Sequence, residues 1–375
     1  MSDVLVSRDN GVGFLTLNRP SAINSLNYSM VMALQAALAE WEHDEAIDAV
    51  VLSGAGQRGL CAGGDVIAFY HSARGDGSAA RRFWYDEYLL NAHISRYSKP
   101  YVALMAGIVM GGGVGVAAHA SVCVVTESSK VAMPEVSNGC IPDVGGTCLL
   151  ARVPGLLGLH AALPERCSPV WTRSRWASRT ARCSTNNCRP SLGRLWKGGR
   201  TRQSARLQKS DHRVALSRSV IGSTLAMRGE TVADIVEALR GHGASGANDA
   251  ATLISSRSPM ALAVTLPAVR RAAKLDTLED VLSQEYRTSC VALRSHDFVE
   301  GIRAQLVDND RSPRWSPRSL ADIISADVEA YFGSTDRELE FCSAKCTDPS
   351  TRLMKRGQNP LKNNKFRSFV RTASC

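Results

Sequence analysis

The sequence predicts an α/β fold in which short buried strands alternate with helices. Short apolar runs end at glycine-bearing loops, and most of these loops are followed by a segment with helical periodicity. Runs such as 47–52 lack the polar alternation of a strand with one wet face, which is typical of parallel strands covered on both sides. With 375 residues, 44% of them apolar, the chain is long enough to bury a core and is not disordered throughout.

The first elements expected are a β-hairpin and a capped helix. Two strand-like runs, 4–6 and 13–17, flank Asn10-Gly11, a dipeptide typical of two-residue hairpin turns. Asn27 is expected to cap a helix, because its side-chain oxygen can accept from an unpaired amide of the first turn. The apolar residues of that helix form one stripe, namely Met30, Val31, Leu34, Ala37, Leu38 and Trp41.

The elements that follow alternate as the fold class requires. The pattern predicts, in order, a buried strand at 47–52, a glycine-rich loop at 54–64, helices near 66–71 and 81–97, strands at 100–106 and 122–126, a loop at 139–147, and amphipathic helices from residue 230 and at 277–294. A short helix is also expected directly after the triple glycine 111–113. Thr277 or Asp276 is expected to cap the last of these helices.

Positive charge is concentrated in two segments that differ from the rest of the chain. The net charge is +10, but residues 164–220 carry 14 basic and 2 acidic side chains, and residues 336–375 carry 9 and 4. The remainder is therefore net acidic, at −7, so the body of the chain does not resemble a nucleic-acid-binding surface. Segment 164–220 also has no strand or helix period, and it holds three of the six tryptophans.

Three interpretations of segment 164–220 stay open: a nucleic-acid-binding arm, a disordered insertion, and a compensated pair of reading-frame shifts that replaced the native sequence. The abrupt change of composition at both edges favours the third, and the tail from 335 is interpreted as a similar readthrough. We therefore expect a core at 1–163, an atypical segment at 164–220, a helical part of the same domain at 221–334, and an atypical tail at 335–375.

The cysteines and the apolar segments predict a cytoplasmic protein. Outside the two basic segments the cysteines are scattered singly, as in a reduced compartment, and residues 1–10 do not have the pattern of a signal peptide. Residues 101–126 contain no charge and would be long enough to cross a bilayer. Five glycines divide this stretch into a strand, a turn and a short helix, so no membrane partner is expected.

Three glycine-bearing loops are the candidate functional site: LCAGGD (60–65), MGGGVG (110–115) and MPEVSNGCIPDVGGT (133–147). Glycine clusters are most often plain turns, and no nucleotide-phosphate motif occurs among them. Two such loops at strand ends can, however, offer unpaired main-chain amides to one developing anion. Glu135 lies among apolar neighbours, where it could act as a general base or a nucleophile, and Asp143 supplies a second carboxylate.

Together with NRP (18–20) and KPYVALMAGIVMGGGVG (99–115), these loops resemble the crotonase superfamily of acyl-CoA enzymes over residues 4–163 and 230–332. Within it the best fit is to the 3-hydroxyisobutyryl-CoA hydrolases. Enoyl-CoA hydratases carry a catalytic glutamate three residues after the middle glycine of the triple-glycine turn, where this chain has Gly115, and they have glycine in place of Asp143. The stretch 295–317 also looks like the hydrolase pattern.

The resemblance implies a spiral of ββα units with a helical C-terminal region that closes the site. It implies an oxyanion hole from the main-chain N–H groups of Gly64 and Gly112, with Glu135 as nucleophile or general base. Asp143 is expected beside the reacting carbon, on the substrate's 3-hydroxyl, and Glu87 in the substrate pocket, against the alternative of a solvated helical face.

The expected function is hydrolysis of 3-hydroxyisobutyryl-CoA, or a similar 3-hydroxyacyl-CoA, in valine breakdown. An enoyl-CoA hydratase or isomerase and an inactive, damaged family member are the alternatives. No cofactor beyond the CoA of the substrate is expected, and the eight isolated histidines predict no metal site. The resemblance leaves homo-oligomer formation open.

Overall fold

The computed structural model describes residues 2–165, 180–182 and 224–341. Most of the two basic segments therefore lies outside the described residues, and so do the expectations about them. The parts of these segments that are described are 164–165, 180–182 and 335–341.

A six-stranded sheet forms one side of the molecule, in the order β1-β2-β3-β5-β7-β9. Its strands are β1 (Val4–Asp9), β2 (Val12–Leu17), β3 (Ala49–Gly54), β5 (Tyr101–Met105), β7 (Val122–Val125) and β9 (Thr180–Arg182). β1 and β2 pair antiparallel through the predicted Asn10-Gly11 turn, in which both residues have positive φ. The other pairs are parallel, as the continuous apolar runs predicted. The strand expected at 47–52 lies two residues further on.

A second, three-stranded parallel sheet was not predicted. It consists of β4 (Gly59–Cys61), β6 (Ile108–Met110) and β8 (Lys130–Ala132), in the order β4-β6-β8. Each strand has only three residues, and β4 lies within the stretch 54–64 that the sequence analysis treated as one loop. That interpretation was wrong for residues 59–61, because Gly59 belongs to a strand and not to a loop. A Cβ on Gly59 would lie 2.4 Å from main-chain atoms of Ile108, so the close pairing of β4 with β6 depends on glycine there.

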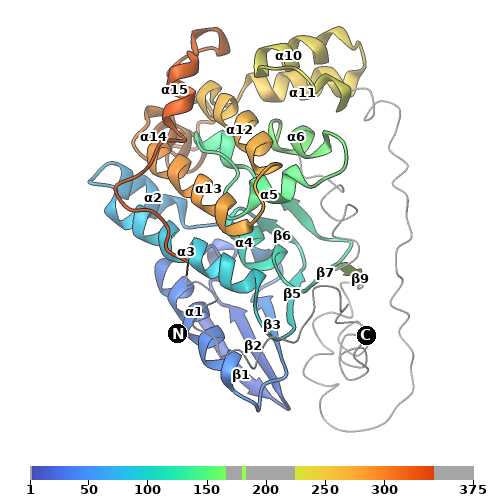
Figure 1. The fold of residues 1–375 in the computed structure, drawn as a ribbon, viewed down its shortest axis with the longest axis vertical. Helices are drawn as coiled ribbons and strands as arrows, with labels where there is room; N and C mark the ends of the chain where they lie inside the picture. The colour runs from blue at the N-terminus through green and yellow to red at the C-terminus, as the bar shows by residue number, and fades with distance from the viewer. Residues whose placement is uncertain (1, 166–179, 183–223, 342–375) are drawn as a thin grey trace.

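Helices cover the sheets, as Figure 1 shows. The N-terminal half contributes α1 (Tyr28–His43), α2 (Val66–Ala73), α3 (Ser78–Ser95), α4 (Gly112–Ala118), α5 (Gly146–Ala151) and α6 (Leu157–Ala162), with the 3₁₀ turns η1 (Pro20–Ala22) and η2 (Glu135–Asn138). The prediction for α1 is confirmed in detail, since Asn27 accepts from the amide of Met30 and the predicted apolar stripe is its buried face. The buried cluster joins this stripe to the strands and to α3.

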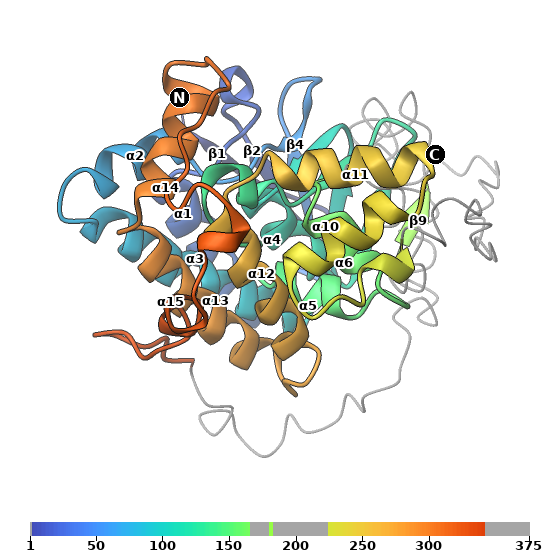
Figure 2. The same cartoon turned by 90° about the horizontal axis from the view of Figure 1, so that it is seen from above.

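The C-terminal part is helical, as predicted. It contains α10 (Val232–Gly241), α11 (Ser245–Ser255), α12 (Pro259–Ala272), α13 (Leu278–Ala292), α14 (His296–Ile302), the π-helix η4 (Arg303–Val307), the 3₁₀ turn η5 (Leu320–Asp322) and α15 (Ser325–Ala330). Thr277 caps α13 by accepting from the amide of Asp280. Figures 1 and 2 show α10 and α11 side by side, away from β1 and β2.

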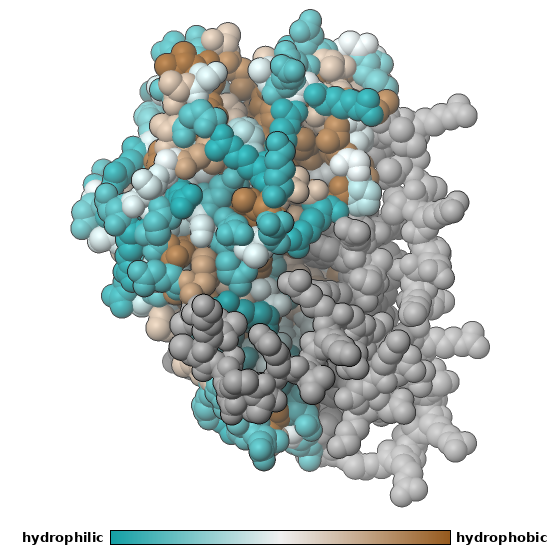
Figure 3. All heavy atoms as spheres, viewed as in Figure 1, coloured by the Kyte–Doolittle hydropathy of each residue, from teal (hydrophilic) through white to brown (hydrophobic). Residues whose placement is uncertain are grey.

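The face of the described part shown in Figure 3 carries both polar and apolar side chains. On the face in Figure 3, hydrophilic side chains dominate around α2 and α3, and apolar side chains gather nearer α12. None of the helices within the described ranges has the length and apolarity needed to span a bilayer. Stretch 101–126 is divided into β5, β6, α4 and β7, as its glycines predicted.

Candidate functional site

The candidate site lies at the carboxyl edge of the small sheet β4-β6-β8. β4 is followed by the loop with Gly64, β6 by the triple-glycine turn with Gly112, and β8 by the turn that carries Glu135. Because parallel strands end at the same edge of a sheet, these three segments converge, although up to about 70 residues of chain separate them. The strands that the sequence analysis missed thus bring together the residues that it singled out.

The Gly64 and Gly112 main chains lie next to each other. A Cβ built on Gly112 would be 3.3 Å from the nitrogen of Gly64, and one on Gly63 would be 3.8 Å from the nitrogen of Gly112. Gly112 begins α4, so its N–H has no acceptor within the helix. In the described part of the chain, neither the Gly64 nor the Gly112 N–H donates to a protein acceptor. Two free amides on adjoining turns are the groups from which an oxyanion hole is built.

Glu135 packs against the triple-glycine turn. A Cβ on Gly111 would lie 3.0 Å from its Oε1, and its Oε2 is buried without a hydrogen-bond partner among the described residues. Burial raises the pKa of Glu135 well above its usual range, and the nearby Asp143 carboxyl adds to this rise. A carboxyl with no fixed partner, next to two free amides, is chemically available to a ligand.

Asp143 lines the same cavity and is held from behind. Its Oδ2 accepts a 2.7 Å hydrogen bond from the hydroxyl of Tyr88, and only 8% of the residue is exposed. Burial raises its pKa to about 6, and the bond from Tyr88 opposes that rise. Asp143 therefore titrates nearer neutrality than an ordinary aspartate does.

The loop that follows Asp143 is held by buried groups of α4 and α13. Val144 has a φ of +52°, an unfavourable value for a β-branched residue, and its carbonyl lies 2.8 Å from Nε2 of His119. Glu285, fully buried on α13, accepts from the amide of Gly145 at 2.6 Å and from the amide and hydroxyl of Thr147 at 2.9 and 2.5 Å. Surrounding structure of this kind is what maintains strained backbone beside a site.

Glu87 is buried, so the alternative of a solvated helical face is wrong. It is 2% exposed on the inner face of α3, and its Oε1 has no hydrogen-bond partner within the described ranges. A Cβ on Gly112 would lie 2.5 Å from this oxygen. Burial raises the pKa of Glu87 well above its usual range, and the Asp143 carboxyl adds to the effect.

All five predicted site residues line one cavity of about 270 Å³. Three of them are carboxyls, and no Lys, Arg or His of the described chain lines the cavity with them. Phe69, Trp84 and Phe298 form an aromatic wall, with ring centroids 5.3 Å apart for the first two and 5.9 Å for the last two. An apolar wall opposite a few polar groups is typical of a site for a small organic ligand.

The sequence analysis missed the residues that support the site. Tyr88, Ser289 and Glu285 had no signal beyond helical periodicity, which does not distinguish a buried tyrosine or glutamate that holds a loop from one that only packs. Gln305 and Leu306 of η4 line the cavity within the stretch 295–317 that was singled out, but the two were not named.

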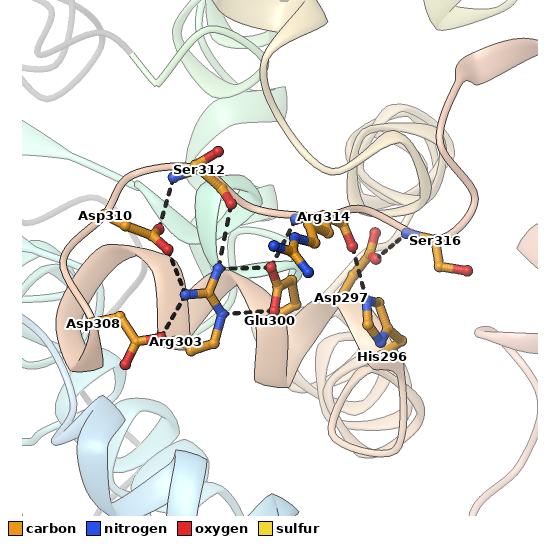
Figure 4. Close-up of polar contacts among 9 residues, drawn as sticks. All are labelled: His296, Asp297, Glu300, Arg303, Asp308, Asp310, Ser312, Arg314 and Ser316. Atoms are coloured by element: carbon orange, nitrogen blue, oxygen red, sulfur yellow. Dashed lines mark hydrogen bonds and ion pairs between the residues drawn. The ribbon is translucent and has the colours of Figure 1, made fainter.

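An arginine cluster fixes the C-terminal wall of the cavity. The Arg303 guanidinium donates to both carboxylate oxygens of Glu300 at 2.8 Å. It also donates to the carboxylates of Asp308 and Asp310 at 2.6 Å each, and to the carbonyl of Ser312. Figure 4 shows this guanidinium at the centre of the cluster. Further along, the amides of Arg314 and Ser316 donate to Glu300 and Asp297, so residues 308–316 are tied back to α14 and η4.

Other kinds of site find no support in the described chain. It holds no group of three or more His, Cys, Asp or Glu residues suited to a metal ion. The five described cysteines are buried thiols. Cys61, beside the first loop, is fully buried, which raises the pKa of its thiol to about 12 and makes it a poor nucleophile.

The α/β architecture and the cavity at the ends of β4, β6 and β8 define the class of crotonase-fold proteins. Two solved structures have this fold: a carnitinyl-CoA dehydratase from Mycobacterium thermoresistibile (52% identity, TM-score 0.80, 91% of this chain and 99% of that one) and an enoyl-CoA hydratase from Rhodobacter sphaeroides 2.4.1 (32% identity, TM-score 0.79, 91% and 100%).

The model of the enoyl-CoA hydratase/isomerase family matches residues 12–166 and 187–332, so the chain belongs to that family. Among curated proteins it is similar to the mitochondrial 3-hydroxyisobutyryl-CoA hydrolases of Danio rerio (33% identity over 346 residues, 89% of this chain and 90% of the relative) and Rattus norvegicus (34% over 352 residues, 91% of each). The chain is therefore an enzyme of the acyl-CoA-binding crotonase superfamily.

Proposed function

We propose that the protein hydrolyses a 3-hydroxyacyl-CoA thioester to the free acid and CoA, with 3-hydroxyisobutyryl-CoA as the candidate substrate. One observation carries the proposal: the free amides of Gly64 and Gly112 adjoin each other, with the unpartnered Glu135 carboxyl against the same turn. Hydrolysis of a thioester needs this pair of functions, a hole for the oxyanion and a carboxylate that attacks or activates water.

In the proposed reaction the thioester oxygen lies between the two amides. In one route, ionised Glu135 takes a proton from water as the water oxygen bonds to the carbonyl carbon; the C–S bond then breaks, and the CoA sulfur receives the proton. In the other, the Glu135 carboxylate attacks the carbonyl carbon and the C–S bond breaks, which gives an anhydride and the CoA thiolate; water then opens the anhydride to the free acid and the Glu135 carboxylate, and the proton released goes to the CoA sulfur. The raised pKa of Glu135 suits the first route, because it makes the carboxylate a stronger base.

Asp143 supports the choice of a hydroxylated acyl group. It lines the cavity beside Glu87 and Glu135, where an ionised carboxylate would accept a hydrogen bond from a 3-hydroxyl. The relatives from Danio rerio and Rattus norvegicus are named for a substrate with that hydroxyl.

Dehydration or hydration of an acyl-CoA is the second candidate, because the relative of 52% identity is named a carnitinyl-CoA dehydratase. The two-glutamate mechanism expected of hydratases would need a carboxylate at position 115. A Cβ on Gly115 would lie 2.7 Å from Cβ of Val144 and about 3 Å from the amide of Asn91, so the space for that side chain is filled. A dehydratase with this site would have to use Glu87 or Asp143 as its second carboxylate.

The deciding experiment measures thiol release and enoyl absorbance in parallel on a panel of acyl-CoAs, with and without the 3-hydroxyl. We expect thiol release from 3-hydroxyisobutyryl-CoA, and a loss on the order of 10³-fold in Glu135→Gln. Asp143→Asn should lose rate chiefly on hydroxylated substrates. Enoyl formation without thiol release would overturn the proposal in favour of the second candidate. In H₂¹⁸O, single-turnover incorporation of label into Glu135 would identify the anhydride route.

A further inference from the structure

Behind Asp143, two buried hydroxyls form a chain of hydrogen bonds. Ser289 on α13 contacts Tyr88 on α3, and Tyr88 bonds Asp143. The hydroxyl of Tyr88 lies 2.7 Å from Oδ2 of Asp143 and 3.1 Å from Oγ of Ser289. Tyr88 and Ser289 are both 0% exposed. A tyrosine hydroxyl has one proton, and here Asp143 accepts it, so the second contact must run from the hydroxyl of Ser289 to the oxygen of Tyr88.

The direction of these hydrogen bonds depends on the protonation state of Asp143. An ionised carboxylate only accepts hydrogen bonds, whereas a protonated one carries a donor of its own. Burial raises the pKa of Tyr88 well above its usual range, so its hydroxyl keeps the proton that it donates to Asp143. This chain of hydrogen bonds therefore favours the ionised form of Asp143 and leaves the remaining lone pairs of that carboxylate to a ligand in the cavity.

Burial of Asp143 opposes its ionisation. Titratable groups from four segments face it, and all of them are neutral or acidic: Glu87 and Tyr88 on α3, Glu135 on η2, Cys140 on the loop that follows it, and Glu285 on α13. No cation of the described chain lines the cavity. Of the three cavity carboxyls, Asp143 has a hydrogen bond from a buried hydroxyl, whereas Glu87 and Glu135 each keep an unpartnered oxygen within the described ranges.

We propose that Tyr88, with Ser289 behind it, is a positioning residue that keeps Asp143 a hydrogen-bond acceptor and so selects acyl-CoA substrates with a hydroxyl near the thioester. The part of this proposal that concerns the substrate rests on the proposed function, whereas the effect of the Tyr88 hydrogen bond on Asp143 does not depend on it. Among the described residues the Tyr88 hydroxyl bonds Asp143 and Ser289, so its effect reaches the substrate through Asp143. A hydroxyl of the substrate would donate a hydrogen bond to the remaining lone pairs of the Asp143 carboxylate. An acyl chain without a hydroxyl would leave those lone pairs without a donor in a desolvated cavity.

The first test observes Asp143 itself and needs no turnover. The side-chain carboxyl carbon of Asp143 is titrated by NMR in the ¹³C-aspartate-labelled full chain, with its signal assigned through Asp143→Asn. In Tyr88→Phe the midpoint should move upward by about one pH unit, and in Ser289→Ala by less in the same direction. Tyr101→Phe is the matched control, because it removes an equally buried hydroxyl whose bond goes to the carbonyl of Val116. Its midpoint should equal that of the wild type.

The second test compares kcat/KM for 3-hydroxyisobutyryl-CoA and isobutyryl-CoA. Tyr88→Phe should lower the ratio of the two by about tenfold, while Tyr101→Phe leaves it unchanged. An unmoved NMR midpoint in Tyr88→Phe overturns the proposal, and so does a moved midpoint with an unchanged ratio. A wild-type protein that releases no thiol from any hydroxyacyl-CoA overturns the proposed function instead. The midpoint then still shows whether Tyr88 holds Asp143.

Discussion

A methyl group on the triple-glycine turn is the sharpest test of the oxyanion hole. The Cβ of Gly112→Ala would lie 3.3 Å from the nitrogen of Gly64 and 2.5 Å from Oε1 of Glu87. An oxyanion bound by the Gly64 amide needs an oxygen about 2.7–3.1 Å from that nitrogen, so methyl and oxyanion compete for one space. Oε1 of Glu87 would also have to retreat by roughly 1 Å, a displacement that alone costs on the order of 10²-fold in a positioned site.

We therefore expect kcat/KM for thiol release to fall by about 10²–10³-fold in Gly112→Ala, which corresponds to about 3–4 kcal/mol of transition-state stabilisation. Thermal melting, followed by circular dichroism, should show that the variant is folded. Gly241→Ala at the end of α10 is the control, because no atom lies within 4 Å of its new Cβ. If Gly112→Ala keeps kcat/KM within about threefold of the wild type, the two amides do not share the reacting oxygen, and the argument from their geometry is wrong.

Two further predictions concern the supports of the site. Burial raises the pKa of Glu285 to about 8, above its value in the unfolded chain, so folding takes up a proton and stability falls as pH rises towards 8. The melting temperature of Glu285→Gln should lie below that of the wild type at pH 6, because the variant loses an acceptor for the amide of Gly145 or Thr147. The difference between the two melting temperatures should be smaller at pH 8; a constant difference would contradict this. Arg303→Gln should lower the melting temperature and raise KM, because residues 308–316 are released from η4, which lines the cavity through Gln305 and Leu306. An unchanged KM would separate that cluster from substrate binding.

The elements that could be predicted from sequence are those whose signal is local. Asn10-Gly11 dictates its hairpin because both turn residues must have positive φ, and Asn27 caps α1 through an amide only three residues away. The α1 stripe follows from one helical period along a single segment. The glycines of the site loops, with Glu135 and Asp143, were found through their pattern and the family resemblance, and the structure brings Gly64, Gly112, Glu135 and Asp143 to one cavity.

What could not be predicted depends on contacts between distant segments. Three-residue strands carry no period, and β4 exists because Gly59 lets its backbone approach Ile108 on β6. The same applies to Tyr88: nothing in its own segment shows that its hydroxyl meets Asp143 rather than a main-chain carbonyl, as that of Tyr101 does. The burial of Glu87 could not be predicted either. The inner face of α3 is covered by the triple-glycine turn, which is distant in sequence, and not by its sequence neighbours.

The loop between Asp143 and Thr147 links the shape of the site to its chemistry. Val144 adopts a strained backbone and places its Cβ where a side chain at position 115 would begin, and Gly115 is what allows this approach. The same loop presents Asp143 to the cavity. A carboxylate from α4 and an Asp143 in its present place therefore exclude each other, unless the loop moves away from His119 and Glu285, which hold it through Val144, Gly145 and Thr147. The departure from the hydratase pattern at 115 and the acid at 143 are thus one structural choice, and a side chain introduced at position 115 alone is expected to displace the loop before it changes the reaction.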